Sequence, residues 1–435
     1  MSTGRTGDRW SDLAGWETLV VTDRVRAAGA WVVALVLVAA AGCGGKDPFT
    51  AESTKADPAG RAAVQAATGV QALPEAPLAG SPQIVGNHGK DLVAWGSIRP
   101  DRTGMQSVTD DGAVLDADTF SWTTLPPPPF KFPTATATGG VVGDELVVTG
   151  YACDADSKPV DSAGPKCAIG AKQAAALNLR TKRWSLVAAG PPSNASDLVT
   201  AHVVDGQLIM EVRPMDGAPT WWRYDSTGRR FDPIAAPPVT VTQVCSSPTT
   251  LAAVEVGARA AGAPGWQPWN MFAFNGGDLY GNARVSFWNT ATNTWGPPSE
   301  PAITSGTSYL TSGCAGGSVV VLAAGRTDAS SDIGAWVISA ATNTWQHRDW
   351  PAAATVGPNL PPDPLQLKVV TDTQVRWRDL ATSQEWSYQP ATNQWTQVPP
   401  QAAVTAANGA LTTATILGRP VLTDEKTNIL TTLPA

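Results

Sequence analysis

From residue 81 onward the chain alternates between short apolar runs and clusters of glycine, proline, aspartate and asparagine. Runs such as "ELVVTG", "QLIMEV" and "SVVVLAAG" are rich in β-branched residues, and turn-forming residues bound each of them. Such runs are typical of strands, and the 3.6-residue period of an amphipathic helix is nearly absent beyond the N-terminal segment. The pattern predicts an all-β protein.

A nine-residue phrase occurs three times, as "FWNTATNTW", "VISAATNTW" and "SYQPATNQW". Weaker copies extend the series in both directions, and each copy ends on a large apolar anchor. The seven anchors are Trp122, Trp184, Phe231, Trp295, Trp345, Trp395 and Leu430. Most copies read as strand, tight turn, strand, longer loop, strand, tight turn and strand. Four antiparallel strands in a recurring unit predict one blade of a β-propeller.

The last tight turn of three copies contains Asn293, Asn343 or Asn393, and asparagine tolerates the left-handed backbone that such turns require. The anchor that follows is expected to begin the outer strand, where a large ring can bury about 200 Å² against the neighbouring blade. Because a blade cannot bury both of its faces alone, we interpret the anchors as core residues and not as a binding stripe.

The repeat resembles the kelch family and its relatives with a galactose-oxidase-like central propeller. In that family a glycine pair closes the second strand of a blade, and a spaced tyrosine and tryptophan mark the third and fourth strands. Here a single glycine remains in several copies, as Gly96, Gly150, Gly257 and Gly325. The resemblance covers residues 81–435 and implies a propeller. We expect seven blades, with six as an alternative because the last copy is short.

Residues 1–42 predict an export signal. Arg24 and Arg26 precede "AAGAWVVALVLVAAAG", which is shorter than the ~20 residues of a comfortable membrane span. The run ends in "AAGCGG", which resembles the lipobox of bacterial lipoproteins and implies a lipid on Cys43. An uncleaved anchoring helix is the alternative, and both hypotheses put the folded domain at the outer face of the cytoplasmic membrane. Residues 43–80 predict a flexible tether.

The remaining four cysteines agree with an exported protein, in which disulfides persist. Cys153 and Cys167 bracket a polar loop, while Cys245 and Cys314 occupy matching places in two successive copies. Four cysteines allow three connectivities, and we expect the pairs Cys153–Cys167 and Cys245–Cys314.

Connections between the second and third strands are long in several copies, whereas the turns at the opposite end of each blade are minimal. Binding residues concentrate on such elaborated loops over a rigid scaffold. The loop that begins at Ala258 carries a cluster of aromatic residues, namely Trp266, Trp269, Phe272, Phe274 and Tyr280. They could stack on sugar rings or anchor a protein partner, or they could form a satellite core beneath the loop.

The composition and the motifs limit which partners and which catalytic sites can be expected. The net charge is -7 and lysine and arginine are scattered, so we expect no nucleic-acid partner. The copper-radical oxidases that share this propeller use two histidines, two tyrosines and a cysteine at the metal. The three histidines here, His88, His202 and His347, fall in separate copies and are not expected to converge. Neither a Gly-x-Ser-x-Gly nor a His-Glu-x-x-His motif occurs, so no catalytic residue and no metal ligand is assigned.

Two acidic clusters are candidate calcium ligands, because carboxylates at alternate positions can bind this ion as a cofactor. The first contains Asp110, Asp111, Asp116 and Asp118, and the second contains Asp154, Asp156 and Asp161. Neither matches an EF-hand loop, and aspartate favours turns irrespective of metal, so we interpret both clusters as solvated turn residues.

The sequence therefore favours a non-catalytic, lipid-anchored propeller that binds a protein or cell-envelope partner through its long loops. A glycan-active enzyme with a site at the central opening is one alternative. A carbohydrate-binding propeller without turnover is another.

Overall fold

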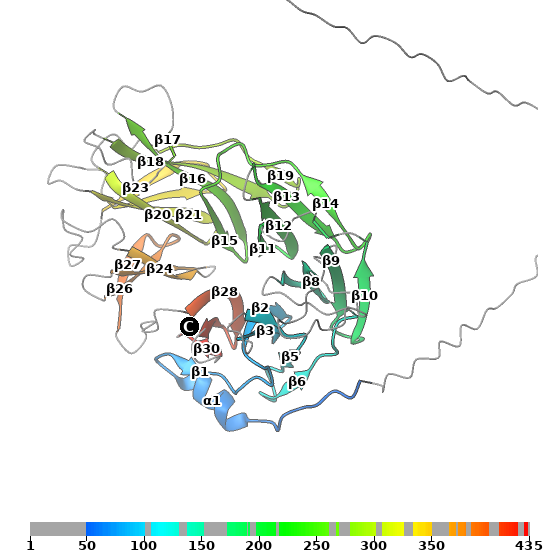
Figure 1. Ribbon diagram of the computed structural model, residues 1–435. Helices are drawn as coiled ribbons and strands as arrows, with labels where there is room; N and C mark the ends of the chain where they lie inside the picture. The colour runs from blue at the N-terminus through cyan, green and yellow to red at the C-terminus, as the bar shows by residue number, and fades with distance from the viewer. Residues whose placement is uncertain are drawn as a thin grey trace, which may run out of the picture. The chain divides into compact units, whose positions relative to one another are not determined.

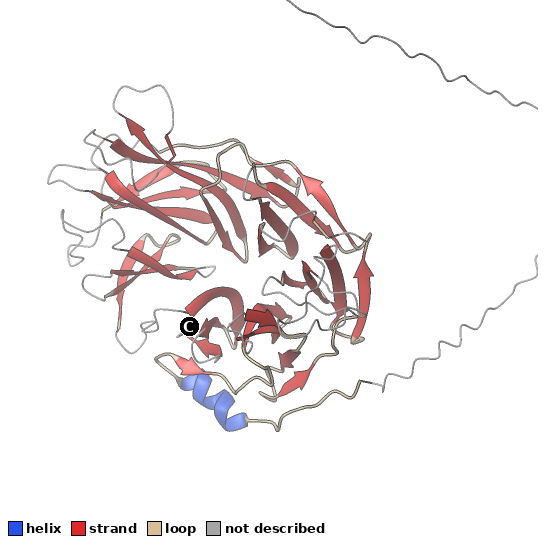
Figure 2. Ribbon diagram, viewed as in Figure 1, coloured by secondary structure: helices blue, strands red, loops and turns tan. Residues whose placement is uncertain are grey.

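The computed structural model divides the chain into two compact units, Met1–Pro48 and Phe49–Ala435. The described residues all belong to the second unit (Figures 1 and 2). They are 49–100, 106–129, 137–151, 172–188, 190–191, 197–214, 217–260, 267–268, 279–301, 307–325, 334–349, 365–370, 373–379, 384–399, 409–424 and 430–433. The expected export signal and Cys43 lie outside them.

Seven antiparallel sheets make up the second unit, and each has four main strands. Blade 1 contains β2 (Ser81–His88), β3 (Asp91–Pro100), β5 (Gly112–Leu115) and β6 (Trp122–Thr124), and β4 (Gln106–Val108) pairs with β3. Blade 2 contains β7 (Thr138–Val142), β8 (Glu145–Tyr151), β9 (Lys172–Asn178) and β10 (Arg183–Val187), and blade 3 contains β11 (Leu198–Val204), β12 (Gln207–Arg213), β13 (Thr220–Asp225) and β14 (Arg230–Ile234). Blade 4 contains β15 (Gln243–Ser247), β16 (Thr250–Ala260), β18 (Leu279–Asn289) and β19 (Thr294–Trp295), and β17 (Gln267–Pro268) pairs with β16. Blade 5 contains β20 (Thr307–Ala315), β21 (Ser318–Gly325), β22 (Gly334–Ser339) and β23 (Trp345–Arg348), and blade 6 contains β24 (Leu365–Val370), β25 (Val375–Asp379), β26 (Glu385–Gln389) and β27 (Gln394–Val398). Blade 7 contains β28 (Gly409–Ile416), β29 (Arg419–Asp424), β30 (Leu430–Thr432) and β1 (Gln71–Ala72).

The first strands of the blades follow one another around a ring. Each contacts the first strand of the next blade, and β28 of blade 7 contacts β2 of blade 1. The expected all-β fold is thus confirmed as a closed propeller of seven blades, and the alternative of six is wrong.

Blade 7 takes its outer strand from the other end of the sequence. Gln71 pairs with Thr432 and Ala72 with Thr431, so β1 completes a sheet whose other strands are C-terminal. Leu430 consequently begins the third strand and not, as expected of an anchor, the outer one. The last copy is short because its fourth strand precedes the first blade in the chain.

Residues 49–73, here called the strap, are folded against blades 1 and 7. This corrects the expected tether over 43–80 in its described part. The strap contains α1 (Pro58–Ala66), which has proline at its start and is capped by Asp57, whose carboxylate accepts a hydrogen bond from the Gly60 amide at 2.8 Å. Val64 is buried in the apolar cluster between blades 1 and 7. No helix among the described residues is long and apolar enough to cross a membrane.

Polar contacts hold both ends of the strap. Near its start, Ser53 forms an antiparallel bridge with Thr123 on the outer edge of blade 1. After α1, the buried Arg419 guanidinium of blade 7 donates hydrogen bonds to the carbonyl oxygens of Ala67 at 2.7 Å and Gly69 at 2.9 Å. The strap therefore spans the junction at which the ring closes.

All six aromatic anchors lie in outer strands, and four of them link their blade to the preceding one. Trp122, in blade 1, is completely buried. Four anchor indoles donate a hydrogen bond to the chain just after the preceding outer strand. These bonds join Trp122 to the Pro74 carbonyl (3.0 Å), Trp184 to the Pro126 carbonyl (2.8 Å), Trp295 to the Ala235 carbonyl (3.0 Å) and Trp345 to the Ser299 hydroxyl (3.1 Å). Phe231 packs on Tyr224, and Trp395 packs on Tyr388.

The turn before each anchor has the backbone that its sequence suggests. Asn293, Asn343 and Asn393 have φ values of 54°, 50° and 53°, in the left-handed region. Lys182 and Arg229 occupy the same place in blades 2 and 3, with φ values of 56° and 46°. The turn geometry is therefore common to blades whose sequences have diverged.

Candidate functional site

The two ends of the propeller differ. At one end, here called the turn face, the first and second strands join through two-residue turns in every blade except the sixth. In several of these turns both residues have a left-handed backbone, as Asp205 and Gly206 do, and Gly316 and Gly317. At the other end, here called the loop face, longer connections join the second and third strands.

The largest described elaboration of the loop face belongs to blade 4. The pairing of β16 with β18 continues to the pair Ala260 and Leu279, whereas the pairing of β16 with β15 ends at Val254. From Val254 to Ala260 the ladder runs on for about 20 Å at the rise of a strand. Residues 257–260, 267–268 and 279–282 form this extension, here called the arm, and Figure 1 shows β16, β17 and β18 projecting from the ring.

The aromatic loop expected to bind a partner connects the strands of the arm. Tyr280 lies in β18, directly opposite Arg259 of β16. The other expected binding residues, Trp266, Trp269, Phe272 and Phe274, lie outside the described residues. Both ends of this loop therefore lie at the loop face, on the paired strands β16 and β18.

Two buried glutamates that were not expected from the sequence lie in blades 3 and 4, and one of them, Glu255, lies in β16 two residues before the arm. Glu211 is 3% exposed and accepts a hydrogen bond from Arg213 at 2.7 Å, and Glu255 is 7% exposed and accepts one from Arg284 at 3.0 Å. Pairing offsets the cost of burying each carboxylate. The sequence signal for them is one glutamate inside each of the apolar runs "QLIMEV" and "LAAVEV".

Both ion pairs lie on the strand faces that form the interface between blades 3 and 4. Because side chains alternate along a strand, Glu211 shares a face with Ile209, and Glu255 shares a face with Leu251. Ile209 and Leu251 pack in one apolar cluster with Trp221. The second strands of both blades run toward the loop face, so the ion pairs lie at that end of the interface. Within each pair the charges balance, which suits a structural role at this interface.

His202 lies deeper in the same interface and is 6% exposed. Its Nδ1 is 3.3 Å from the hydroxyl oxygen of Ser246 in blade 4, and its ring stacks with Trp221 at a centroid distance of 6.3 Å. Burial lowers the pKa of His202 to about 4, because the interface cannot solvate an imidazolium. At neutral pH the ring is uncharged, and its Nδ1 can accept a hydrogen bond from the Ser246 hydroxyl.

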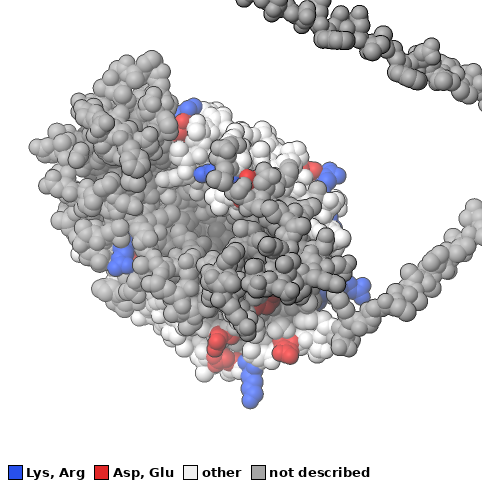
Figure 3. Space-filling model, viewed as in Figure 1, with Lys and Arg blue, Asp and Glu red and all other residues white. Residues whose placement is uncertain are grey.

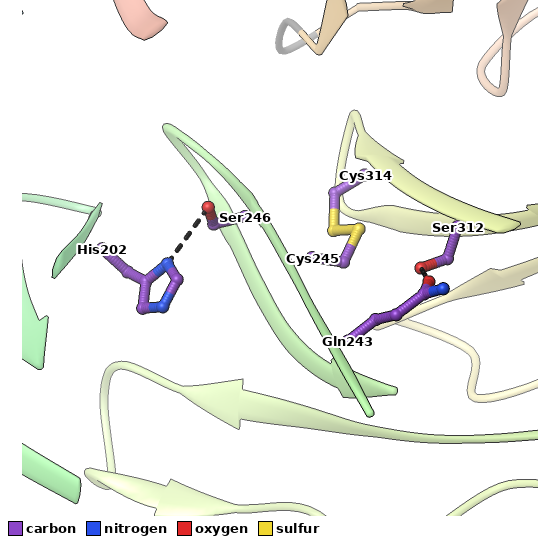
Figure 4. Close-up of a disulfide and its surroundings, with 6 residues drawn as sticks. All are labelled: His202, Gln243, Cys245, Ser246, Ser312 and Cys314. Atoms are coloured by element: carbon purple, nitrogen blue, oxygen red, sulfur yellow. Dashed lines mark hydrogen bonds between the residues drawn. A yellow bond between two sulfur atoms is a disulfide. The ribbon is translucent and has the colours of Figure 1, made fainter. Parts of the chain in front are cut away.

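The first strand of blade 4 is attached to both of its neighbours, as Figure 4 shows. On one side lies the His202–Ser246 contact. On the other side Cys245 forms a disulfide with Cys314 of blade 5, with the two Cα atoms 5.5 Å apart, in agreement with the expected pairing. The expected partners Cys153 and Cys167 lie outside the described residues.

The three histidines occupy three different blades. His88, at the turn face of blade 1, contacts the Asp144 carboxylate of blade 2 at 3.0 Å, and Arg180 contacts the same carboxylate at 2.9 Å. His347 lies in the outer strand of blade 5, where its ring packs on Trp336. The structure does not bring these rings to one site.

The first acidic cluster is divided between the two ends of β5. Asp111 accepts hydrogen bonds from the hydroxyl groups of Ser97 and Thr109. Burial would raise the pKa of Asp111, but these hydrogen bonds outweigh it and hold the pKa below its usual value. Asp116, at the other end, accepts a hydrogen bond from the Thr119 amide at 2.8 Å, which lowers its pKa.

Of the remaining acidic candidates, Asp118 and Asp110 belong to the described residues. Asp118 forms an ion pair with Lys90 at the turn face. Asp110 is adjacent to Asp111, and the second cluster, Asp154, Asp156 and Asp161, lies outside the described residues. Within the part of the chain that the structure describes, no three His, Cys, Asp or Glu side chains gather as a metal site.

In the view of Figure 3, basic and acidic groups of the described residues are interspersed and form no patch of one sign. No family model matches the sequence, and no curated protein matches it. The function is therefore inferred from the residues and from the propeller itself.

Proposed function

We propose that this protein is a non-catalytic, lipid-anchored propeller outside the cytoplasmic membrane, and that it binds a protein or another cell-envelope component at its loop face. The difference between the two faces carries the proposal. At the turn face the first and second strands join through two-residue turns in six of the seven blades, whereas the loop face bears the arm, and the buried carboxylate of Glu255 is paired with Arg284 close to the point where the arm begins. Binding segments typically extend from a rigid scaffold in this way.

Other parts of the proposal come from the sequence. The apolar run that ends at Cys43 supports export and lipid attachment at that residue. The single glycines that close several second strands support a divergent kelch-like origin for the blades. A non-catalytic role is supported by the wide separation of the histidines and by the pairing of the buried carboxylates at the blade 3–blade 4 interface.

The test compares the intact domain with a variant that lacks the arm. Gly257 and Asn282 are paired opposite each other, so an Asn-Gly turn can join them and leave the rest of blade 4 intact. Both proteins, without the lipid, are crosslinked to envelope fractions, and captured components are identified by mass spectrometry. We expect a specific partner with the intact domain and at least a tenfold lower yield without the arm.

The matched control changes the opposite face. Thr292, Thr342 and Thr392 are exposed in equivalent turns of blades 4, 5 and 6, and their replacement by lysine should leave capture unchanged. Equal capture with and without the arm, in proteins that unfold at the same temperature, would refute binding at the loop face. Loss of capture on addition of soluble glycans would instead identify a carbohydrate-binding propeller.

A further inference from the structure

The strap and the arm lie on opposite sides of the ring. The strap covers the junction of blades 1 and 7, and the arm belongs to blade 4, which is the farthest blade from that junction in either direction around the ring. Figure 1 shows α1 and β1 on one side of the ring and β16–β18 on the other. A chain that leaves the propeller before the strap therefore leaves it opposite the arm.

The strap is attached to the blades very close to the expected lipid. The Glu52 amide donates a hydrogen bond to the Thr124 hydroxyl at 2.9 Å, and the Thr124 amide donates one to the Glu52 carbonyl at 2.9 Å. Only nine residue steps separate Cys43 from Glu52, and a fully extended chain of that length spans about 30 Å. A lipid at Cys43 would hold the outer edge of blade 1 within that distance of the bilayer.

The strap also exposes two apolar side chains, one beside the outer edge of blade 1 and one beside the outer edge of blade 7. Among the described residues, four large hydrophobic side chains are exposed, namely Phe49 (45%), Val70 (38%), Leu186 (65%) and Leu198 (62%). Phe49 precedes the segment that runs antiparallel to β6, so it lies toward the loop face. Val70 immediately precedes β1, an outer strand that starts at the turn face. Phe49 and Val70 therefore lie at the loop-face end and the turn-face end of the outer edge that the strap forms on blades 1 and 7, here called the rim.

We infer that the rim formed by the strap on blades 1 and 7 lies against the lipid bilayer, so that the ring stands on its edge and the arm points away from the membrane. The inference rests on the proposed lipid attachment at Cys43. An edge-on ring brings Phe49 and Val70 to the lipid together, whereas a ring lying on either face brings only one of them there.

Charge does not drive this contact. The ionisable residues of the strap are Glu52, Lys55, Asp57 and Arg61, two acids and two bases. Contact with lipid should therefore be insensitive to salt and to the charge of the lipid headgroups. The partner of the arm then lies in the envelope layer above the membrane, separated from the bilayer by the width of the ring.

The experiment places a photo-crosslinking amino acid, p-benzoylphenylalanine, at one exposed apolar position at a time in the full chain. Phe49 and Val70 report on the strap, and Leu186 and Leu198 are matched controls of equal or greater exposure elsewhere. After irradiation of intact membranes, lipid adducts are measured by mass spectrometry. We expect at least fivefold more adduct at both strap positions than at either control.

The mass of the mature N-terminal peptide, measured in the same preparation, separates the two proposals. If Cys43 carries lipid but the controls crosslink as well as the strap, or only one strap position crosslinks, the edge-on orientation is refuted and lipid attachment stands. If Cys43 carries no lipid, the anchoring proposal fails and the orientation fails with it.

Discussion

Acidification should destabilise the propeller through His202, before the carboxylates are protonated. In the unfolded chain this imidazole has a pKa of 6.5, and in the folded protein burial lowers the pKa to about 4. Between these values the unfolded state binds a proton that the folded state does not. Stability contributed by the neutral ring is therefore complete above pH 6.5 and is lost as the pH falls toward 4.

The magnitude follows from the two pKa values. The linkage relation gives a loss of about 2 kcal/mol in the free energy of unfolding between pH 7 and pH 4.5. Desolvation is the cause of the shift, and the neighbouring groups offer no compensating charge. Glu211, on the same face of blade 3, is engaged by Arg213, and Ser246 is neutral. The low pKa values of Asp111 and Asp116 add a further loss at more acidic pH.

The assay compares the wild type with His202→Gln, which keeps a polar side chain but does not titrate. Denaturant unfolding at pH 7 and pH 4.5, followed by tryptophan fluorescence, should show a pH-dependent loss of stability about 2 kcal/mol smaller in the variant. His347→Gln is the control for removal of an imidazole. Because the chain has only three histidines, NMR titration can also report the pKa of His202 directly.

Two results would refute the reasoning. A His202 resonance that titrates near pH 6.5 would show that the interface between blades 3 and 4 admits water. Equal pH dependence in the wild type and His202→Gln would show that the ring contributes nothing to acid sensitivity.

Three further predictions concern the ring. Trp122→Ala should lower the free energy of unfolding by about 3–5 kcal/mol in denaturant titrations, because the indole is fully buried; a loss below about 1 kcal/mol would contradict its place between blades. Replacing Cys245 and Cys314 together by alanine should cost about 4 kcal/mol, since the disulfide closes a loop with a sequence separation of 69; an unchanged unfolding midpoint would exclude that contribution. Arg419→Met should release the strap, so that trypsin cleaves at Arg61 at least tenfold faster while the other blades resist; equal cleavage rates would show that the two strap carbonyl contacts are dispensable.

Much of the fold was predictable because its signals are local and repeated. The left-handed turns at Asn293, Asn343 and Asn393 use a residue whose side chain favours that backbone. The anchor two positions later follows from the same turn, since the turn sets which side chain begins the outer strand. One copy departed from this rule, at Leu430, where the sequence offered no sign that the outer strand came from residues 71–72.

The candidate site was less predictable. The asymmetry between the two faces was visible in the sequence as a difference in loop length. Glu211 and Glu255, in contrast, appear in the sequence as isolated acids within apolar runs. Their roles depend on Arg213 and Arg284, which approach them only when the strands are paired and the blades are packed.

By itself, the sequence of this protein determined an all-β chain, a four-strand repeat, the turns that separate the strands and a cysteine pair placed alike in neighbouring copies. These properties depend on residues a few positions apart, or on spacings that recur. The tertiary structure alone decided how the ring closes, that the supposed tether is a folded strap, and that His202 is neutral. Each of these depends on groups far apart in the chain, as when Gln71 pairs with Thr432, and burial and hydrogen bonding between such groups exist only after the blades have assembled.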